Sequence, residues 1–359
     1  MERIRAVVIM AGGRGERFWP QSRLRRPKHL LPIVGEKPML RQTIERLDGL
    51  VSPERIWVIT NAEQTDAVRE ICPEIPEGQI VAEPVGRDTA PAVALAALLV
   101  DISMGDSAFA MLPADHVIHD EASFRHDLEA AFSSAEDQPV IATVGIQPTF
   151  AATGYGYIKT YGGEKNGVFL VDQFVEKPNK ETAGTYLKDD RYFWNGGIFV
   201  WRPSTILAAI EKYCPELHDS LRRIRSALSS NESLSTVLPR EYPRLTKISI
   251  DYAVMEKADN VVMVRSSFDW DDVGSWPAIE RHYDADQDEN VTEGSVVMED
   301  SKNNLLLSTE EHLVGVIGIE GLMVVHTPDA TLICPKDRAQ DVKQLVKKIT
   351  SLPNGKDYL

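Results

Sequence analysis

A six-residue apolar run near the start of the chain, AVVIMA at residues 6–11, is followed at once by a loop rich in glycine and cations. An apolar run without alternating polar residues is typical of a strand buried on both faces of a parallel sheet. The loop contains Gly12, Gly13 and Gly15, which lack a Cβ and so let backbone N–H groups approach an anion. Because open α/β sheets bind ligands at the carboxyl ends of their strands, this pattern predicts a doubly wound α/β sheet with a phosphorylated nucleotide at the loop.

The same loop is strongly basic, although the chain as a whole is acidic. The 359-residue protein has a formal net charge of −15, and Glu16 is the acid that faces a series of loop cations. These cations are Arg14, Arg17, Arg23, Arg25, Arg26 and Lys28. The overall charge argues against nucleic-acid and membrane-surface partners, which favour a basic face. The basic loop therefore indicates a local anion site.

The spacing of the loop residues excludes two better-known phosphate loops. A P-loop ends in Gly-Lys-Ser/Thr, and no such triplet follows Gly12 or Gly13. The dinucleotide-binding fingerprint requires a third glycine where this chain has Phe18. What remains is the pattern G-G-x-G-x-R-x-W-P at residues 12–20, followed by P-K-x-L-L-P-I at residues 27–33.

This arrangement resembles the signature of the sugar-nucleotide pyrophosphorylases, nucleotidyltransferases that act on sugar 1-phosphates. The details Phe18-Trp19-Pro20 and Ser22-Arg23 are most similar to the mannose-1-phosphate guanylyltransferase branch of that family. The resemblance implies an enzyme that converts GTP and α-D-mannose 1-phosphate to GDP-mannose and diphosphate with Mg²⁺. Glucose 1-phosphate with UTP or dTTP is an alternative substrate pair, and a non-catalytic nucleotide-sugar sensor is an alternative function.

Strand-like and helix-like segments alternate through the first half of the chain, and the middle third changes character. The predicted strands are at 6–11, 56–60, 79–84, 108–115 and 139–146, with strand-like segments at 155–161, 167–178 and 194–202 and a last sheet strand near 261. The predicted helices are at 38–50, 62–71, 89–104, 121–135, 180–189 and 203–228. This order predicts a mostly parallel, doubly wound, Rossmann-like sheet of the nucleotidyltransferase type. We therefore expect a catalytic domain at residues 1–285.

The predicted secondary structure changes after about residue 285. Short strands separated by Asp, Asn, Glu and Gly turns predict a small β-rich domain at residues 286–359, as a coil, a sandwich or a left-handed β-helix. A final helix places Val342, Leu345, Val346 and Ile349 on one face. That face can pack on its own domain or on a partner subunit, and a homodimer contact through it is our hypothesis.

Nucleotidyl transfer to a sugar phosphate needs no side-chain nucleophile, because the attacking phosphate oxygen is already anionic near neutral pH. Catalysis then depends on alignment and on cations that offset repulsion between phosphates. Mg²⁺ suits this role because it binds through one or two carboxylates plus phosphate oxygens. Asp115 in LPADH and Asp272 in WDDVGSW each follow a hydrophobic strand. The resemblance places the metal-binding aspartates at the same two positions, with Asp271 as the alternative to Asp272.

The resemblance also assigns residues to the two substrates. Arg17 and Lys28 match the basic pair that grips the triphosphate and the leaving pyrophosphate. The nucleotide set comprises Ala11, Gly12, Gly13, Gly15, Glu83, Pro84, Arg87, Asp88, Thr89 and Ala90. Asp88 replaces an asparagine that is frequent in the family, and a helix cap is favoured for it over a contact with the base. The sugar-phosphate set comprises Gly156, Glu176, Lys177, Asn195 and Gly196, with Glu176 for sugar hydroxyls and Lys177 for the phosphate.

The sequence argues against disulfides, a signal peptide, a membrane span and a helical zinc site. Three cysteines without a C-x-x-C pair predict reduced thiols in a cytoplasmic protein. The N-terminus lacks the apolar core of a signal peptide, and no apolar stretch is long enough for a membrane span. His116, His119 and His126 lie near Asp115, but their spacing lacks the i,i+4 pair of a helical zinc site.

Overall fold

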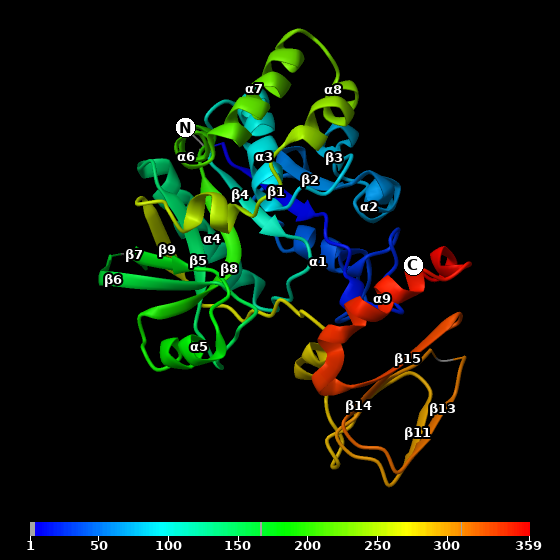
Figure 1. Cartoon of the computed structure of the whole chain (residues 1–359). Helices are drawn as coiled ribbons and strands as arrows, with labels where there is room; N and C mark the ends of the chain where they lie inside the picture. The colour runs from blue at the N-terminus through cyan, green and yellow to red at the C-terminus, as the bar shows by residue number, and fades with distance from the viewer. Residues whose placement is uncertain (1–3, 166, 310) are drawn as a thin grey trace.

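The strand β1 (Ala6–Ala11) lies within a nine-stranded sheet of the computed structural model, which describes residues 4–165, 167–309 and 311–359. The strand order is β3-β2-β1-β4-β8-β5-β9-β7-β6, and β1 is parallel to both β2 and β4. Figure 1 shows β1 between these neighbours, with helices on both sides of the sheet. The predicted α/β nucleotidyltransferase fold is confirmed.

The elements of this part of the chain follow the predicted alternation. The strands of the sheet are β1, β2 (Ile56–Asn61), β3 (Ile80–Glu83), β4 (Phe109–Pro113), β5 (Ile141–Ile146), β6 (Tyr157–Lys165), β7 (Val168–Val175), β8 (Tyr192–Trp201) and β9 (Val261–Arg265). The helices are α1 (Met39–Glu45), α2 (Thr65–Ile71), α3 (Thr89–Met104), α4 (Glu121–Asp137), α5 (Lys180–Tyr186), α6 (Pro203–Tyr213), α7 (Pro215–Ser229) and α8 (Leu234–Glu241).

The direction of the strands changes along the sheet. The strands β3, β2, β1 and β4 are parallel, whereas β8 runs antiparallel to both β4 and β5. In the hairpin β6–β7, β6 also pairs with β8 and β7 also pairs with β9. Hydrophobic patterning predicts where a strand lies but not the direction in which it pairs with its neighbours. β5 and β9 are parallel to each other, but the pairings of β8, β6 and β7 are antiparallel, so the sheet is mixed and not mostly parallel as predicted. The strand β4 leads directly to Asp115.

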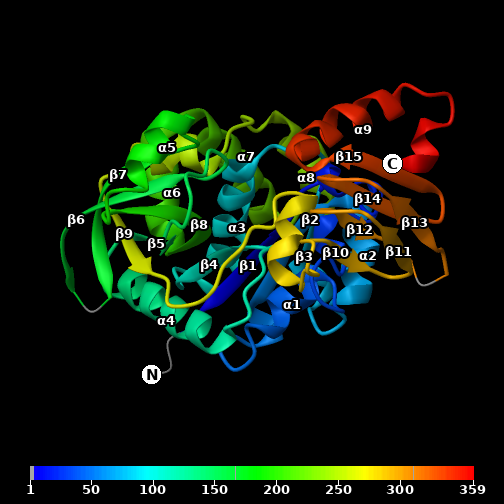
Figure 2. The same cartoon turned by 90° about the horizontal axis from the view of Figure 1, so that it is seen from below.

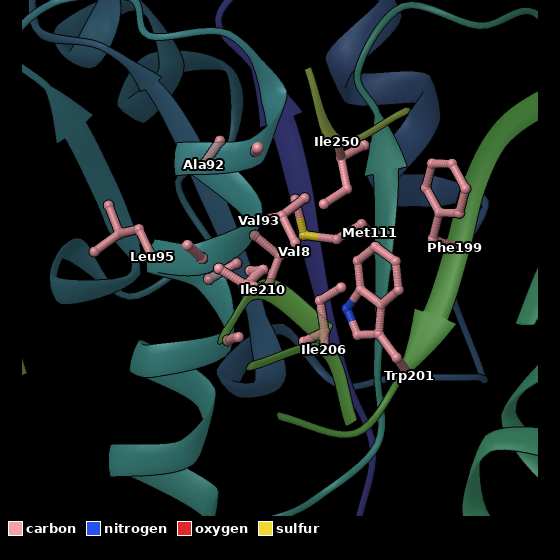
Figure 3. Packing of buried hydrophobic residues seen from close by; sticks show 14 of the residues in the cluster. Val8, Ala92, Val93, Leu95, Met111, Phe199, Trp201, Ile206, Ile210 and Ile250 are labelled. Atoms are coloured by element: carbon pink, nitrogen blue, oxygen red, sulfur yellow. The ribbon is translucent and has the colours of Figure 1, made fainter. Parts of the chain in front are cut away.

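The two faces of the sheet bury separate groups of apolar side chains. Successive residues of β1 alternate between them, because neighbouring side chains of a strand point to opposite faces. Figure 3 shows the first group, where Val8 of β1 and Met111 of β4 pack with Val93 of α3 and Ile206 of α6. The second group includes side chains of α1, α2 and α4. A sheet covered by helices on both faces presents its strand ends as the open edge for a ligand.

The predicted helix at 203–228 is two helices. α6 ends before Cys214, whose backbone has φ −145° and ψ 63°, and α7 begins at Pro215. A proline lacks the backbone N–H and disfavours the helical conformation at the preceding residue, so the helix breaks there. None of the helices in the described part of the chain is long and apolar enough to span a membrane.

The C-terminal part is a coil of short parallel strands. They are β10 (Val291–Glu293), β11 (Val296–Glu299), β12 (Leu305–Leu307), β13 (Val314–Ile317) and β14 (Leu322–Thr327), followed by β15 (Ala330–Pro335) and α9 (Val342–Thr350). The chain alternates between two parallel sheets, β10-β12-β14 and β11-β13, which is the path of a β-helix, and β15 pairs antiparallel with β14. The predicted β-rich domain that ends in a helix is confirmed.

Three of the four side chains on the apolar face of α9 are buried within the chain, whereas Leu345 is 38% exposed. Val342, Val346 and Ile349 share a cluster with Phe18 and Trp19 of the glycine-rich loop. Figures 1 and 2 both show the red α9 beside the blue segment that follows β1. The hypothesis that this face forms a subunit contact is therefore wrong for these three side chains, because the chain's own loop covers them. A homodimer through another surface stays a prediction.

Candidate active site

A cavity of about 350 Å³ lies where the glycine-rich loop meets the segments after β4 and β9. It brings together Arg17, Lys28, Asp115 and Asp272, the four residues predicted to act directly in catalysis. The first two come from the loop, Asp115 follows β4, and Asp272 follows β9. Side chains up to 255 positions apart in the sequence therefore line one site.

Lys28 connects the two aspartates. Its side chain is only 6% exposed. The Nζ atom donates to the backbone oxygen of Asp115 at 2.8 Å, to Asp115 Oδ2 at 2.9 Å and to the backbone oxygen of Asp272 at 2.6 Å. A lysine ammonium has three N–H donors, so all three are used by these two segments. Lys28 thus holds the aspartate segments together, whereas the resemblance implied a direct grip on the triphosphate.

The two aspartates each keep one carboxylate oxygen free. Asp115 uses Oδ2 for Lys28, and Asp272 accepts a hydrogen bond from the Tyr155 hydroxyl at Oδ1, at 2.6 Å. Within the described residues, Asp115 Oδ1 and Asp272 Oδ2 have no hydrogen-bond donor. Burial raises the pKa of Asp115, but the positive charge of Lys28 and the neighbouring His116 outweigh it and lower that pKa to about 2. Asp115 is therefore ionised at neutral pH.

The structure separates Asp271 from Asp272, which the sequence left open. Asp271 is buried and accepts bonds from Arg281 Nε and Nη2 at 2.6 and 2.7 Å, from His282 at 3.0 Å and from the Val273 backbone N–H at 2.8 Å. Burial opposes ionisation of Asp271, but hydrogen bonds from His282 and Arg281 hold the pKa of its carboxyl well below the usual range. Asp272 lines the cavity instead. Adjacent residues of an extended segment point to opposite sides, so only one of the pair reaches the site.

Asp271→Asn is expected to destabilise the fold. The substitution removes the charge that pairs with Arg281 and accepts from His282, and it puts an amide N–H₂ where two donors now point. Because Arg281 is partly exposed, the free energy of unfolding should fall by about 2 kcal/mol, less than for a fully buried pair. Urea denaturation measures this loss. An unfolding free energy equal to that of the wild-type protein would show that the ion pair contributes nothing.

The conformation of the glycine-rich loop depends on Gly15 and Arg17. Gly15 has φ +62°, and a Cβ there would lie 2.7 Å from the backbone nitrogen of Lys28, so a side chain is excluded. Arg17 Nη1 donates to the carbonyl oxygen of Gly274 at 3.1 Å, while its Nε is buried and without a partner in the described residues. Arg17 therefore ties the loop to the segment of Asp272. Gly13 has open space around it.

A second cavity, of about 550 Å³, begins beside the first, and Arg14 lines both. The second cavity is also lined by Gly12, Glu83, Pro84 and Asp88, from the predicted nucleotide set. A Cβ at Gly12 would lie 3.1 Å from Glu83 Oε2, so the glycine leaves room for this carboxyl. Asp88 Oδ1 accepts a hydrogen bond from the Thr89 backbone N–H at 2.8 Å and caps α3.

The other members of the predicted nucleotide set hold neighbouring segments. The Arg87 guanidinium donates to the Pro243 carbonyl. Thr89 Oγ1 accepts a hydrogen bond from the Ile250 backbone N–H at 2.8 Å, and the Ala90 backbone N–H donates to the Ile248 carbonyl at 3.1 Å. Ala11 is buried at the end of β1. These four residues are not among those that line the second cavity, which in the described part of the chain is lined by their neighbours Gly12, Gly86 and Asp88 among others.

Glu83 is a buried acid whose charge state depends on pH near neutrality. Its side chain accepts a hydrogen bond from the Tyr242 hydroxyl, and the residue is 6% exposed. Burial raises the pKa of Glu83 to about 7. The carboxyl is therefore partly protonated at neutral pH in the free protein.

This pKa predicts a pH dependence of stability. Between the ordinary value of 4.5 and about 7, the folded state holds a proton at Glu83 that the unfolded state has released. Stability should therefore fall as the pH rises through that window. Because Glu83→Gln cannot titrate, its stability relative to the wild-type protein should improve by about 2–3 kcal/mol between pH 5 and pH 8. Denaturation at both pH values measures the difference, and a pH-independent difference would contradict the raised pKa.

The predicted sugar-phosphate residues gather around a partly buried acid, Asp251, that the sequence analysis missed. A Cβ at Gly156 would lie 2.7 Å from Glu176 Oε2 and 3.3 Å from Asn195 Cβ. Asn195 Nδ2 donates to Asp251 Oδ1 at 3.3 Å. Burial and the charge of Glu176 raise the pKa of Asp251 to about 6. Asp251 is an acid within the apolar segment ISIDYAVM, which is the only sign of it in the sequence.

Two neighbours complete this cluster. The Lys177 ammonium forms an ion pair with Glu176 and is half-exposed, and its φ of +46° turns the chain sharply. Gly196 leaves no room for a side chain, because a Cβ would lie 2.9 Å from the Val144 carbonyl oxygen. The cluster therefore presents acid, amide and ammonium groups together, which suits a ligand with hydroxyls and a phosphate.

The histidines near Asp115 have separate roles. His116 lines the first cavity, its Nδ1 accepts a hydrogen bond from Trp270 Nε1 at 3.1 Å, and burial lowers its pKa to about 4. His119 instead pairs with Asp269 at 2.6 Å. Across the described ranges, no group of three or more His, Cys, Asp or Glu side chains is arranged to hold a metal.

The fold and the paired aspartates beside a glycine-rich loop define a nucleotidyltransferase. The family model "Nucleotidyl transferase" matches residues 6–289, and the model "MannoseP isomerase/GMP-like beta-helix domain" matches residues 294–349. The chain belongs to the nucleotidyl transferase family.

Relatives of known name align with nearly the whole chain. Mannose-1-phosphate guanylyltransferase RfbM from Salmonella typhimurium is 38% identical over 94% of this chain and 71% of the relative. Alginate biosynthesis protein AlgA from Pseudomonas aeruginosa is 37% identical over 95% of this chain and 71% of the relative. The crystal structure of a "mannose-1-phosphate geranyltransferase" from Thermus thermophilus has a TM-score of 0.86 and 38% identity, covering 97% of this chain and 99% of that one.

Proposed function

We propose that this enzyme converts GTP and α-D-mannose 1-phosphate to GDP-mannose and diphosphate. The observation that carries the proposal is the meeting of Asp115 and Asp272 beside Arg17 and the glycine-rich loop. The names of the relatives support guanosine and mannose as the substrate groups. We further propose a catalytic unit at residues 1–285 and a C-terminal unit at residues 286–359.

The two aspartates fit Mg²⁺. This ion takes one or two protein carboxylates and fills its other positions with water and phosphate oxygens, so a larger set of acids is not needed. Asp115 Oδ1 and Asp272 Oδ2, which lack donors in the described part of the chain, are the oxygens that would hold it. When bound, the ion supplies positive charge to the transferring phosphate.

The second cavity supports the choice of base. Guanine presents N1–H and N2–H₂ donors, which pair with a carboxylate acceptor. Glu83 offers such an acceptor, because Tyr242 occupies Oε1 while Oε2 lies beside Gly12 at the cavity wall. The base would lie in this second cavity, and the triphosphate of the nucleotide would extend beside Arg14, which lines both cavities, into the first cavity.

The cluster around Asp251 supports a hexose phosphate. Glu176 and Asn195 are the groups for sugar hydroxyls, and Lys177 is the group for the phosphate. Gly156 leaves the space beside Glu176 and Asn195 open. In the reaction, a phosphate oxygen of the sugar attacks the α-phosphorus, and pyrophosphate leaves with the electron pair of the broken P–O bond. The chain's part is to align these groups and exclude other geometries.

A pyrophosphate-release assay with a panel of substrates tests this proposal. GTP with mannose 1-phosphate should give the highest kcat/KM, and UTP or dTTP with glucose 1-phosphate should be slower by up to about 10⁴-fold, as hydrogen-bonding sites allow. Preference for glucose 1-phosphate with UTP or dTTP would overturn the substrate assignment. Absence of release with every pair would leave a nucleotide-sugar sensor as the function.

Lys177→Ala is expected to weaken binding of the sugar phosphate only. The ammonium is half-exposed, so its loss should leave the fold intact, and the KM for mannose 1-phosphate should rise about tenfold with little change in the KM for GTP. Lys180→Ala, three positions along on the exposed surface of α5, is the control and should match the wild-type protein. An equal rise in the KM for GTP would contradict the assignment of Lys177 to the sugar phosphate.

A further inference from the structure

The C-terminal helix supplies a cation to the first cavity. Lys343, the second residue of α9, lines that cavity together with Arg14 and Arg17 of the glycine-rich loop. None of the predicted site residues comes from this part of the chain, and the phosphate-binding residues of the sequence analysis all precede residue 180. Figure 1 shows α9 reaching from the C-terminal coil back to the loop that follows β1.

Several contacts hold α9 in this place. Its buried Val342 and Val346 pack in the same cluster as Phe18 and Trp19 of the loop. Trp19 Nε1 also donates to the Tyr358 carbonyl at 2.8 Å. These contacts join the helix to the loop at the two residues that directly follow Arg17. The backbone of Lys343 is therefore fixed at the cavity rim, and its flexible side chain remains free to meet a ligand.

Ion pairs fasten the C-terminal coil to the same two segments that carry the site. Arg23 in the loop pairs with Asp329 at 2.7 Å. Lys336 pairs with Glu280, which follows the Asp272 segment, at 2.8 Å. The coil is thus attached to both the loop and the metal-site segment, and these attachments fix its position relative to the cavity.

The Lys343 ammonium has no anionic partner within ion-pair distance among the described residues. Burial and the positive charge of Arg17 lower the pKa of Lys343, whereas Glu16, another residue of the cavity wall, opposes that shift. The carboxylate of Asp115 is already paired with Lys28. Among the residues that line this cavity, the cations Arg14, Arg17, Lys28 and Lys343 outnumber the acids Glu16, Asp115 and Asp272. The cations repel each other, and an anionic ligand relieves that repulsion.

We propose that Lys343 binds the terminal phosphates of the nucleoside triphosphate and the pyrophosphate that leaves, so that the C-terminal unit completes the nucleotide site. This inference rests on the proposed function for the identity of the triphosphate substrate. Lys343 shares a cavity with the glycine-rich loop, and the charge of Arg17 acts on it more strongly than that of Lys177 in the sugar cluster. As the bond between the α-phosphorus and its bridging oxygen breaks, the electron pair goes to pyrophosphate, and the ammonium lies where that charge develops.

Calorimetric titration of the full chain with Mg²⁺-pyrophosphate tests the inference. Lys343→Ala and Lys343→Gln should bind pyrophosphate about tenfold more weakly than the wild-type protein, because one charge–charge contact is lost. Lys343→Arg retains the charge and should restore most of the affinity. Lys348→Ala is the matched control, because this lysine lies on the same helix but outside the first cavity, and its affinity should be unchanged. The deficit of Lys343→Gln should shrink at high salt, as for any contact between charges.

Equal pyrophosphate affinities in the wild-type, Lys343→Ala and Lys343→Gln proteins would overturn the inference. An equal loss in Lys348→Ala would also overturn it, because the effect would then be one of overall charge. Urea denaturation of each variant checks that the fold is intact, and Lys343→Gln keeps most of the side-chain stem. Since pyrophosphate carries neither base nor sugar, this result does not depend on the substrate panel. A wild-type protein inactive with GTP and mannose 1-phosphate would refute the proposed function while leaving this measurement interpretable.

Discussion

Replacing Asp272 with Asn is expected to lower kcat by about 10³-fold or more, and Asp115→Asn should do the same. Each substitution keeps the shape of the side chain but removes one negative charge from the pair that would hold Mg²⁺. Metal stabilisation of a transferring phosphate contributes several kcal/mol, and about 1.4 kcal/mol corresponds to a factor of ten in rate. Asp272 should tolerate the change structurally, since its one described side-chain bond is to the Tyr155 hydroxyl.

Single-turnover rates at saturating substrates and varied Mg²⁺ measure this effect. Asp259→Asn is the control, because this aspartate is exposed and precedes β9, at the end of the strand remote from the site. It should retain the wild-type rate. Full activity in Asp115→Asn would remove the metal site from this cavity, and full activity in Asp272→Asn would mean that Asp115 holds the ion without it.

Lys28→Met is expected to damage both the rate and the fold. Methionine matches the length of the lysine stem but leaves the Asp115 carboxylate and two backbone carbonyls without the donor that now joins them. We expect the free energy of unfolding to fall by about 2 kcal/mol, less than the cost of leaving a fully buried charge unpaired, because the Asp115 side chain is 39% exposed. The rate should fall by about 10²-fold or more, because a displacement near 1 Å at the aspartates is enough for such a loss.

The same variant distinguishes two roles for Lys28. If Lys28 positions the aspartates, Lys28→Met should lower kcat, weaken the dependence on Mg²⁺ and reduce stability together. A direct grip on the triphosphate would instead raise the KM for GTP and leave the unfolding free energy unchanged. Lys37→Met serves as the control, because this lysine is 60% exposed and pairs with Glu45 on the surface. Urea denaturation and steady-state kinetics on the same preparations separate the two outcomes.

Local signals in the sequence were sufficient for the fold class and for much of the candidate site. The apolar run of β1 and the glycine-rich loop predict a buried strand that ends at an anion site, because the backbone properties of these residues act over a few positions. The α3 helix was predicted with the bounds that the structure has, since Asp88 caps its start and Gly105 follows its end. Asp115 could also be predicted from the sequence, because it is an acid that directly follows a strand.

Other features depend on groups that are distant in the sequence. The choice between Asp271 and Asp272 was decided by Arg281 and His282, which occupy Asp271 and leave its neighbour to the cavity. Nothing in the local pattern WDDVGSW carries that information, because both residues are acids in the same extended segment. The position of Lys28 was similarly decided by two carbonyl oxygens from separate segments.

The sequence by itself determined which strands and loops would form, and which acids and cations would follow them, because those properties depend on residues a few positions apart. Only the tertiary structure decided that Lys28 joins the aspartate segments and that α9 brings Lys343 to the cavity. The apolar face of α9 suits a partner subunit as well as its own chain. Burial against Phe18 and Trp19 selected its own chain, and the hydrophobic effect that drives this burial is non-directional, so helical periodicity alone cannot predict which surface is covered.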